Sequence, residues 1–252
     1  MPQFVRLQLL LLVVSMVVPA ACMILRLTSS LDPLLLSNVA LVFLLVCWIL
    51  ALLTPALFSG GADRTSRRIS FIAAWSAIAI FFPLAWDLPW AIFHEWVRGA
   101  TADDAAQWFF WAYAVADTRF LRSDHLMIIV EYGSGVIAVL EIAFAVLLWR
   151  NRVSRAIRVF LVASSFQFYG CAVFFLSQVL DGFASIRPDF LSYLKFFGLN
   201  GMWVIFPALS GIMLVRLARD PEFDATSAIR SLLSAAPAGN SAAPDQLAGS
   251  AR

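Results

Sequence analysis

Residues 117–131 read DTRFLRSDHLMIIVE and pass from a charged loop directly into an apolar helix. Within the apolar part, which begins at Leu126, the chain places a carboxylate at Glu131. An ionisable side chain inside a membrane span is costly and marks a functional site by default. Glu131 is therefore the first candidate for a functional residue in this chain.

The composition around this stretch is that of a membrane protein. The 252 residues are 62% hydrophobic and 13% charged, which is more apolar surface than a soluble core of this size needs. Several apolar runs reach the length of about 20 residues that spans a bilayer. We predict an all-α integral membrane protein with about six transmembrane helices, at residues 7–25, 34–58, 69–97, 126–149, from there to about 180, and 191–215.

The chain divides into three parts. Residues 1–30 are predicted to form an extra, uncleaved transmembrane helix, because the apolar run continues past the signal-peptide-like Ala20-Ala21-Cys22. Residues 31–219 are expected to form a helical bundle that encloses an intramembrane pocket. Residues 220–252 are rich in Ala, Ser, Pro and Gly, so we expect a disordered tail.

Arginine placement predicts the orientation in the membrane. The basic loops after the second and fourth helices, and the arginines after the sixth, fall on one side if there are six spans. The acidic segment 98–124 falls on the other side, and its aromatic patch Trp108–Tyr113 suits a short helix lying at the membrane interface. By the positive-inside rule, both termini and the tail are expected to be cytoplasmic.

Each of the later helices carries one polar stripe at helical spacing. Lipid offers these side chains no partners, so the stripes are expected to face one another or a cavity. The stripes consist of Asp87, Trp90 and His94; Glu131, Ser134, Ala138 and Glu141; Ser164, Gln167, Cys171, Phe174 and Gln178; and Phe196, Asn200, Trp203 and Pro207.

Several of these residues also have ordinary explanations. Gln167 and Asn200 could be interhelical hydrogen-bonding groups, and Glu141 could pair at the arginine-rich edge. Trp203 alone could be a bundle filler. Three residues after Asn200, on the stripe predicted to face the carboxylate, it becomes a candidate π surface for a cation.

Two further pairs are equally open. His94 and Glu95 lie near a helix end, where an interfacial pair is as reasonable as a catalytic one. Asp117 with Arg119 could be a local ion pair of the loop. Glu131 has no such alternative, because a span interior gives it no solvent.

The chemistry that suits such a chamber is proton transfer. A carboxylic acid in apolar surroundings can stay protonated at neutral pH and protonate an alkene or an epoxide. Aromatic faces can shelter the resulting carbocation, and a second carboxylate or a histidine can take a proton from the neighbouring carbon. The sequence has no glycine-rich phosphate loop, metal-ligand cluster, nucleophile elbow or nucleic-acid-binding patch, so no cofactor, metal or nucleic acid is expected.

Five short motifs follow one another at nearly fixed spacing. They are Asp117-Thr118-Arg119-Phe120, Glu131, Gln167-Phe168-Tyr169-Gly170, Asp181-Gly182-Phe183 and Asn200-x-x-Trp203-x-x-x-Pro207. Together they resemble the emopamil-binding-protein family (the EXPERA domain), whose best-known activity is sterol Δ8–Δ7 isomerisation. The resemblance covers about residues 65–215 and implies a five-helix bundle, with the first helix as an addition.

The resemblance also implies roles for individual residues. Glu131 would be one acid/base partner, and Asn200 and Trp203 would attend the carbocation. The family's His-x-x-x-Glu pair is absent, because His94 and Glu95 are adjacent here, so the second partner stays open among His94, Glu95 and Asp87. The residues that would close or line the substrate site are Asp117, Arg119, Phe120, Gln167, Tyr169 and Trp90.

The sequence therefore predicts a membrane-embedded isomerase that shifts a double bond in a sterol-like or terpenoid substrate. The alternatives are a terpene or meroterpenoid cyclase and a non-catalytic sterol- or lipid-binding protein. The expected partners are a hydrophobic polycyclic small molecule and the lipid bilayer, and a homodimer is compatible with this pattern. In a eukaryote, the resemblance implies the endoplasmic reticulum membrane.

Overall fold

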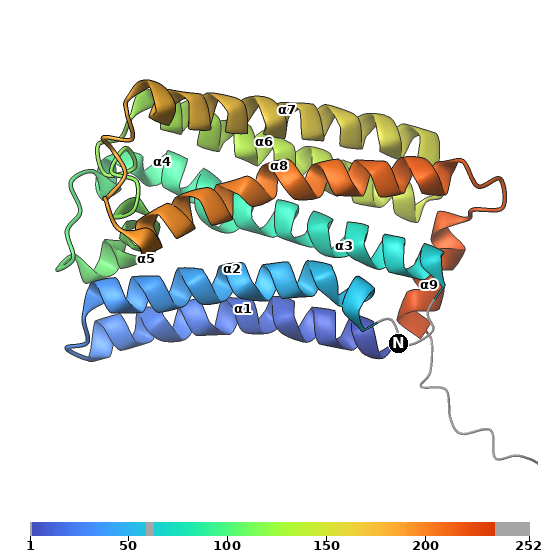
Figure 1. Ribbon diagram of the computed structural model, residues 1–252, viewed down its shortest axis with the longest axis horizontal. Coiled ribbons are helices and arrows are strands. Elements are labelled where there is room, and N and C mark those ends of the chain that lie inside the picture. Colours follow the sequence, from blue (N-terminus) through green and yellow to red (C-terminus); the bar gives the residue numbers. More distant parts are fainter. Residues whose placement is uncertain (1, 59–62, 235–252) are drawn as a thin grey trace, which may run out of the picture.

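The computed structural model describes residues 2–58 and 63–234, and this part of the chain is built from helices and their connections, without a strand. In chain order the elements are α1 (Gln3–Thr28), α2 (Pro33–Leu57), α3 (Arg64–Phe82), the π-helix η1 (Pro83–Asp87), α4 (Leu88–Val97), the 3₁₀-helix η2 (Ala105–Gln107), α5 (Trp108–Ala114), α6 (His125–Trp149), α7 (Val153–Leu180), α8 (Phe190–Ala218) and α9 (Ala225–Ser234) (Figure 1).

Within these residues, six helices are long and apolar enough to cross a membrane. They are α1, α2, α6, α7, α8 and the continuous unit α3–η1–α4, which is 34 residues long. The predicted all-α, multi-pass membrane fold is confirmed, and the observed spans agree with the predicted ones to within a few residues.

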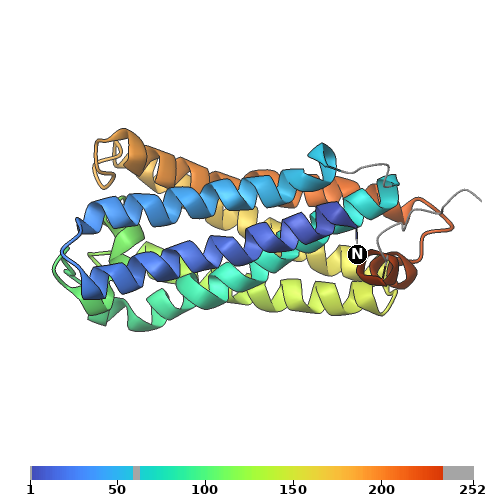
Figure 2. The same ribbon diagram turned by 90° about the horizontal axis from the view of Figure 1, so that it is seen from below.

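The long helices run side by side along the long axis of the molecule (Figures 1 and 2). α1 packs along α2, whereas α7 packs against both α6 and α8. The third span lies between these groups, since α3 contacts α2, α6 and α8. Its central position explains why Trp75 and Ala79 are completely buried.

Aspartates fix the starts of four of these helices. A carboxylate at the N-cap accepts hydrogen bonds from the first free backbone N–H groups of a helix. Asp32 accepts from Leu34 N at 2.9 Å, and Asp63 from Ser66 N at 2.8 Å. Asp124 and Asp189 do the same for α6 and α8, each at 2.9 Å.

The third span changes its helical winding at Pro83–Asp87, where it forms one π-helical segment. Pro83 and Pro89 lack the backbone N–H that a regular α-helix requires, so a wider turn is tolerated here. Phe93 also leaves the helical region, with φ −103° and ψ 15°. The third span therefore departs from a regular α-helix twice, at the π turn and in its distorted last turn.

The short helix predicted around the aromatic patch exists as α5, but it is packed into the bundle. Trp108, Trp111 and Tyr113 are buried. The indole Nε1 of Trp108 donates to the carbonyl of Pro33 at 3.3 Å, which ties α5 to the start of α2. The hairpin of α1 and α2 thus covers aromatic residues that composition alone assigned to the membrane interface.

The loop from α5 to α6 is held by a buried ion pair. Arg119 Nη2 lies 2.6 Å from Asp117 Oδ2, with both side chains at most 6% exposed. Arg119 Nη1 donates to Ser177 Oγ on α7 at 2.6 Å, and Gln178 Nε2 donates to Asp117 Oδ1 at 3.3 Å. The backbone N–H of Thr118 donates to Ser185 O at 2.9 Å. The loop is therefore clamped to the end of α7 and to the α7–α8 loop.

The tail differs from the expectation over part of its length. Ala225–Ser234 form α9, which packs against α3 and α6 and buries Ala225 and Leu232. The amide N–H of Ala225 donates to Asn151 Oδ1 at 3.0 Å. Apolar residues at helical spacing supply the burial that the Ala- and Ser-rich composition seemed to lack. The remainder of the expected disordered tail, 235–252, lies outside the described residues.

We expect Asp117→Asn to lower the free energy of unfolding by about 3–5 kcal/mol, because breaking a buried ion pair leaves the Arg119 charge uncompensated. Thermal unfolding in detergent micelles measures this. Arg187→Gln is the matched control, since it breaks a half-exposed pair with Asp189, and its cost should stay below about 1 kcal/mol. Equal losses in both variants would contradict the clamping role.

Candidate functional site

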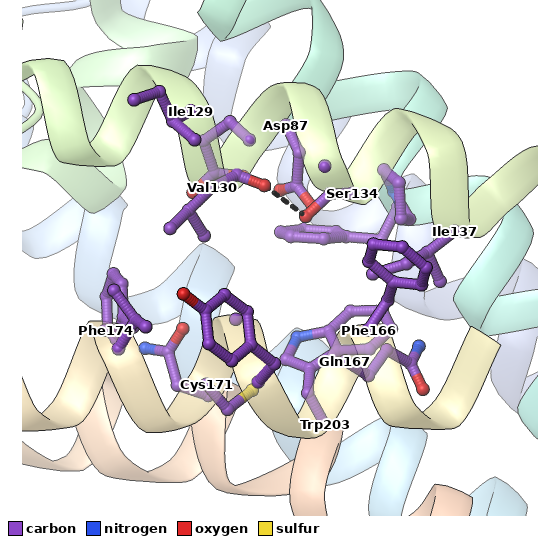
Figure 3. A pocket seen from close by; sticks show the side chains of 18 of the residues that line it. Asp87, Ile129, Val130, Ser134, Ile137, Phe166, Gln167, Cys171, Phe174 and Trp203 are labelled. Carbon is purple, nitrogen blue, oxygen red and sulfur yellow. Dashed lines mark hydrogen bonds between the residues drawn. The ribbon is translucent and has the colours of Figure 1, made fainter. Parts of the chain in front are cut away.

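The central cavity lies inside the bundle and measures about 300 Å³. Figure 3 shows Asp87 and Ser134 on one side of it and Gln167, Cys171 and Trp203 on the other. The wall is mostly apolar with a few polar groups, as in most small-molecule sites. Its lining includes these predicted site residues: Asp87, Phe120, Glu131, Gln167, Tyr169, Asn200 and Trp203.

Two carboxyl groups meet at the cavity wall. Asp87 of η1 and Glu131 of α6 are 7% and 6% exposed. Both carboxyl groups line the same cavity and are close enough to interact electrostatically, and the Ser134 hydroxyl stands beside Asp87. Without a cation beside them, two neighbouring carboxyl groups in an apolar site are not both ionised. The pair therefore holds at least one proton and presents an acid next to a base.

Ser134 has a second local contact. Its hydroxyl lies 3.4 Å from the carbonyl of Val130, one turn earlier in α6, and the dashed line in Figure 3 marks this interaction. Glu131 and Ser134 are three residues apart, so both project from the same face of α6. Asp87, at the end of the π turn of the third span, lies beside Ser134 on the same side of the cavity (Figure 3).

Aromatic rings form much of the opposite wall. Trp203 of α8 packs its indole against Trp75 at 5.1 Å and Phe82 at 6.1 Å between ring centroids. Trp86 stacks on Phe82 at 5.9 Å. These contacts hold Trp203 in place while it still lines the cavity. The faces of these aromatic rings carry partial negative charge and can therefore stabilise a cation.

Asn200 is oriented by a partner that the sequence did not indicate. Its Nδ2 donates to the Tyr113 hydroxyl at 2.7 Å and to the carbonyl of Phe196 at 2.6 Å. With both amide hydrogens used, the Oδ1 of Asn200 has no bond among the described residues and remains an acceptor at the wall. Tyr113 belongs to α5, so the short aromatic helix takes part in the site.

The cavity opens sideways between α6 and α7. Three of its lining residues are strongly exposed: Ile129 (68%), Phe166 (53%) and Tyr169 (72%). They come from these two neighbouring helices, so the cavity reaches the lipid-facing surface there. Gln167 is 3% exposed and makes no hydrogen bond with any described residue, which leaves a buried amide next to the cavity without a partner.

His94 and Glu95 are not part of this cavity. Glu95 is 62% exposed and pairs with Arg98 at 2.6 Å, while His94 Nδ1 lies 3.5 Å from Glu95 Oε1. They sit on the last turn of α4, beyond the distorted residue Phe93. The residue brought to Glu131 is the third alternative, Asp87.

Three further predicted site residues lie behind the cavity wall. Trp90 is fully buried and packs edge-on against Phe120, with 4.7 Å between ring centroids. Asp117 and Arg119 form the ion pair that holds the loop carrying Phe120. Phe120 itself lines the cavity. Trp90, Asp117 and Arg119 do not line the cavity themselves and affect it by holding Phe120 in place.

Phe82, Trp86 and Tyr113 also line the cavity, although no sequence pattern marked them as site residues. Trp86 could have been predicted as a lining residue, because it precedes Asp87 in the segment between Pro83 and Pro89. Tyr113 carried no signal, since it belongs to a short helix whose packing depends on the rest of the fold.

Glu141 does not pair with an arginine at the arginine-rich edge of the bundle, as the sequence allowed. It is completely buried, and its Oε2 accepts a hydrogen bond from Ser76 Oγ at 3.1 Å. The carboxyl lies inside the bundle, between α6 and α3, rather than at the arginine-rich edge. Among residues 2–58 and 63–234, no three His, Cys, Asp or Glu side chains gather in a way that could hold a metal ion.

Comparisons with known proteins support the resemblance to sterol isomerases. The chain is 32% identical over 104 residues to a rice (Oryza sativa subsp. japonica) protein named probable 3-beta-hydroxysteroid-Delta(8),Delta(7)-isomerase, and 29% identical over 97 residues to an Arabidopsis thaliana protein of the same name. The matches span 40% and 38% of this chain, and less than half of each relative, 46% and 44%. No family model matches the chain.

The site predicts a pH effect on stability. Burial raises the pKa of Tyr113 well above its ordinary value, the negative charge of Asp117 adds to this, and the hydrogen bond from Asn200 opposes it. The folded protein keeps the phenol protonated while the unfolded chain ionises near about pH 10, so stability falls as the pH rises above that value.

We expect Tyr113→Phe to remove this loss, worth at most about 1.4 kcal/mol per pH unit above pH ~10. Unfolding temperatures of wild type and variant, followed from neutral to strongly alkaline pH, measure the difference. Tyr132→Phe at an exposed position is the control. Parallel curves for wild type and Tyr113→Phe would contradict the burial of a protonated phenol at this site.

Proposed function

We propose that this protein is a membrane-embedded isomerase that shifts a double bond in a sterol-like or terpenoid substrate by protonation and deprotonation. The observation that carries this is the buried Asp87–Glu131 pair, which faces an aromatic cavity open to the lipid. The names of the plant relatives support the same class of reaction.

The acid of the pair starts the reaction. The protonated carboxyl donates its proton to one carbon of the alkene, and the positive charge appears on the other alkene carbon. Because Asp87 and Glu131 share a proton, one group is ready to donate while the other is an anion. A fixed negative charge next to the forming cation lowers the barrier without any reorganisation of solvent.

The wall of the cavity then holds the cation. The indole of Trp203 presents a π face, and the free Oδ1 of Asn200 can orient toward the positive charge. The anionic carboxylate of the pair removes a proton from the carbon on the far side of the cation. One proton enters and one leaves, so the double bond moves and the composition of the substrate is unchanged.

Access through the side of the bundle fits a hydrophobic polycycle. The exposed residues Ile129, Phe166 and Tyr169 would form a lateral mouth, so a substrate dissolved in the bilayer could enter without crossing water. Gln167 would supply a buried amide to a polar group of the substrate. Phe120, held by Asp117 and Arg119 and backed by Trp90, would close the end of the site.

The arrangement in the membrane is also part of the proposal. Arginines gather at the end where α3 begins and α6 ends, so this end would face the cytoplasm together with both termini. α1 would be an addition to the isomerase bundle, because the motif resemblance begins only near residue 65.

We expect Glu131→Gln and Asp87→Asn each to lower turnover by about 10²–10⁴-fold, since each removes one proton-transfer partner. Glu95→Gln is the matched control and should retain near wild-type turnover, because Glu95 is exposed and paired with Arg98. Membranes containing the protein are incubated in heavy water with Δ8-sterols and, separately, with epoxidised prenyl compounds.

Deuterium at an allylic carbon of a ring-intact sterol supports isomerisation. Ring closure of the epoxidised prenyl compound would replace the proposal by a cyclase that uses the same acid. Binding of cationic amphiphiles without turnover of either substrate would make the protein a lipid-binding one. Full turnover in both Glu131→Gln and Asp87→Asn would remove the pair from the mechanism.

A further inference from the structure

A second cavity, of about 380 Å³, lies on the other side of the third span. It is separate from the central cavity, because the two share no lining residue. Its wall comes from four helices, α1, α3, α6 and α9, and is almost entirely apolar. Representative residues are Leu12 of α1, Ala77 of α3, Phe144 of α6 and Leu232 of α9.

This cavity exists because α1 lies along α2 and approaches α3 closely at only a few positions. One of these is a buried hydrogen bond, in which Ser70 Oγ donates to Gln8 Oε1 at 2.6 Å. Gln8 Nε2 in turn donates to the carbonyl of Ala51 at 2.9 Å. The polar groups on this wall are thus satisfied by the protein, which leaves an apolar space.

The space is open to the bilayer. Leu9, Trp149 and Leu233 line it and are 46%, 46% and 57% exposed. Ala73 and Ala77, one helical turn apart, are also exposed on its α3 wall. An apolar gap that reaches the hydrocarbon gains dispersion contacts when a chain fills it, so an acyl chain is the natural occupant.

Three arginines adjoin lining residues of the cavity in the sequence. Arg6 follows the lining residue Val5, and Arg67 and Arg68 precede the lining residue Ile69. We call these three residues the arginine rim. In the described part of the chain, none of them takes part in an ion pair or a side-chain hydrogen bond.

Nearby acidic groups are already engaged. Asp63 accepts hydrogen bonds from the Ser66 N–H and hydroxyl at 2.8 and 2.7 Å. Asp224 caps α9 by accepting from Thr226 N at 2.9 Å and from Ser227 Oγ at 2.8 Å. The arginine rim is therefore available to an anion from outside the protein.

The helix α9 borders the same cavity. Both views show it lying across the ends of the long helices (Figures 1 and 2). Its residues Ile229, Leu232 and Leu233 line the cavity. A short helix that lies across the bundle with its apolar side on the cavity sits at the depth of lipid headgroups.

We infer that the second cavity binds an anionic membrane phospholipid. One acyl chain would occupy the space between α1, α3 and α6, and the phosphate group would contact the arginine rim beside α9. Arginine suits a phosphate because its guanidinium donates two parallel hydrogen bonds. Basic pockets between transmembrane helices on the cytoplasmic side are typical anionic-lipid sites. The inference is independent of the proposed isomerase reaction.

The test uses the full chain in nanodiscs that contain phosphatidylcholine with a small fraction of spin-labelled phosphatidylglycerol or spin-labelled phosphatidylcholine. We expect an immobilised lipid signal that favours phosphatidylglycerol. Arg6→Gln/Arg67→Gln/Arg68→Gln should keep the immobilised chain but lose the preference, about fivefold per arginine and up to about 10²-fold in total.

Ala77→Trp should fill the cavity and abolish the immobilised signal, since Ala77 is exposed on its wall. Ala208→Trp, at an exposed position of α8 outside both cavities, is the matched control and should leave the signal unchanged. Equal immobilisation of both lipids by the wild type, or an unchanged signal in Ala77→Trp, would overturn the inference. Because the readout needs no turnover, a failed isomerase assay would not affect it.

Discussion

A carboxyl group surrounded by hydrocarbon must keep its proton or find a partner, and this constraint organises the core of the structure. Asp87 and Glu131 satisfy it through each other, from two different spans. Because lipid supplies no alternative partner, the third span and α6 have to meet at this level. The cavity, its aromatic wall and the position of α8 are arranged around that meeting point.

The chain treats its other buried charges differently. Asp117 and Arg119 are of opposite sign and form several hydrogen bonds, so both can remain ionised, and their effect is to fix a loop. Asp87 and Glu131 have the same potential charge and line one apolar cavity, so burial favours keeping a proton on the pair. The Asp117–Arg119 ion pair stabilises the fold, whereas the Asp87–Glu131 pair offers a proton for transfer. Both lie close to Phe120, which connects the clamped loop to the cavity.

Periodicity in the sequence was sufficient for much of this arrangement. Six spans followed from apolar runs, and Glu131, Asn200 and Trp203 were assigned to inward faces because lipid cannot satisfy polar stripes. The choice among Asp87, His94 and Glu95 could not be made in the same way. That stripe assumes one continuous α-helix, and the segment contains a π turn and a distorted residue that change the direction of each side chain.

Residues without a helical period were harder still. Tyr113 reaches Asn200 from a short helix whose place is set by α2, so no local pattern could indicate it. The same holds for α9, because its burial depends on α3 and α6. Composition predicted a disordered tail for that segment, although Ile229, Leu232 and Leu233 stand at helical spacing.

The π turn at Pro83–Asp87 also sets the rotational phase of the third span. Each residue of an α-helix turns the chain by about 100°, so one extra residue in a wide turn rotates everything after it relative to everything before it. The first half of the span is oriented by Trp75 and Ser76, and the second half by Asp87 and Trp90. The wide turn thus rotates the second half of the span relative to the first. One membrane helix can therefore pack against two sets of neighbours that a uniform helix could not face together.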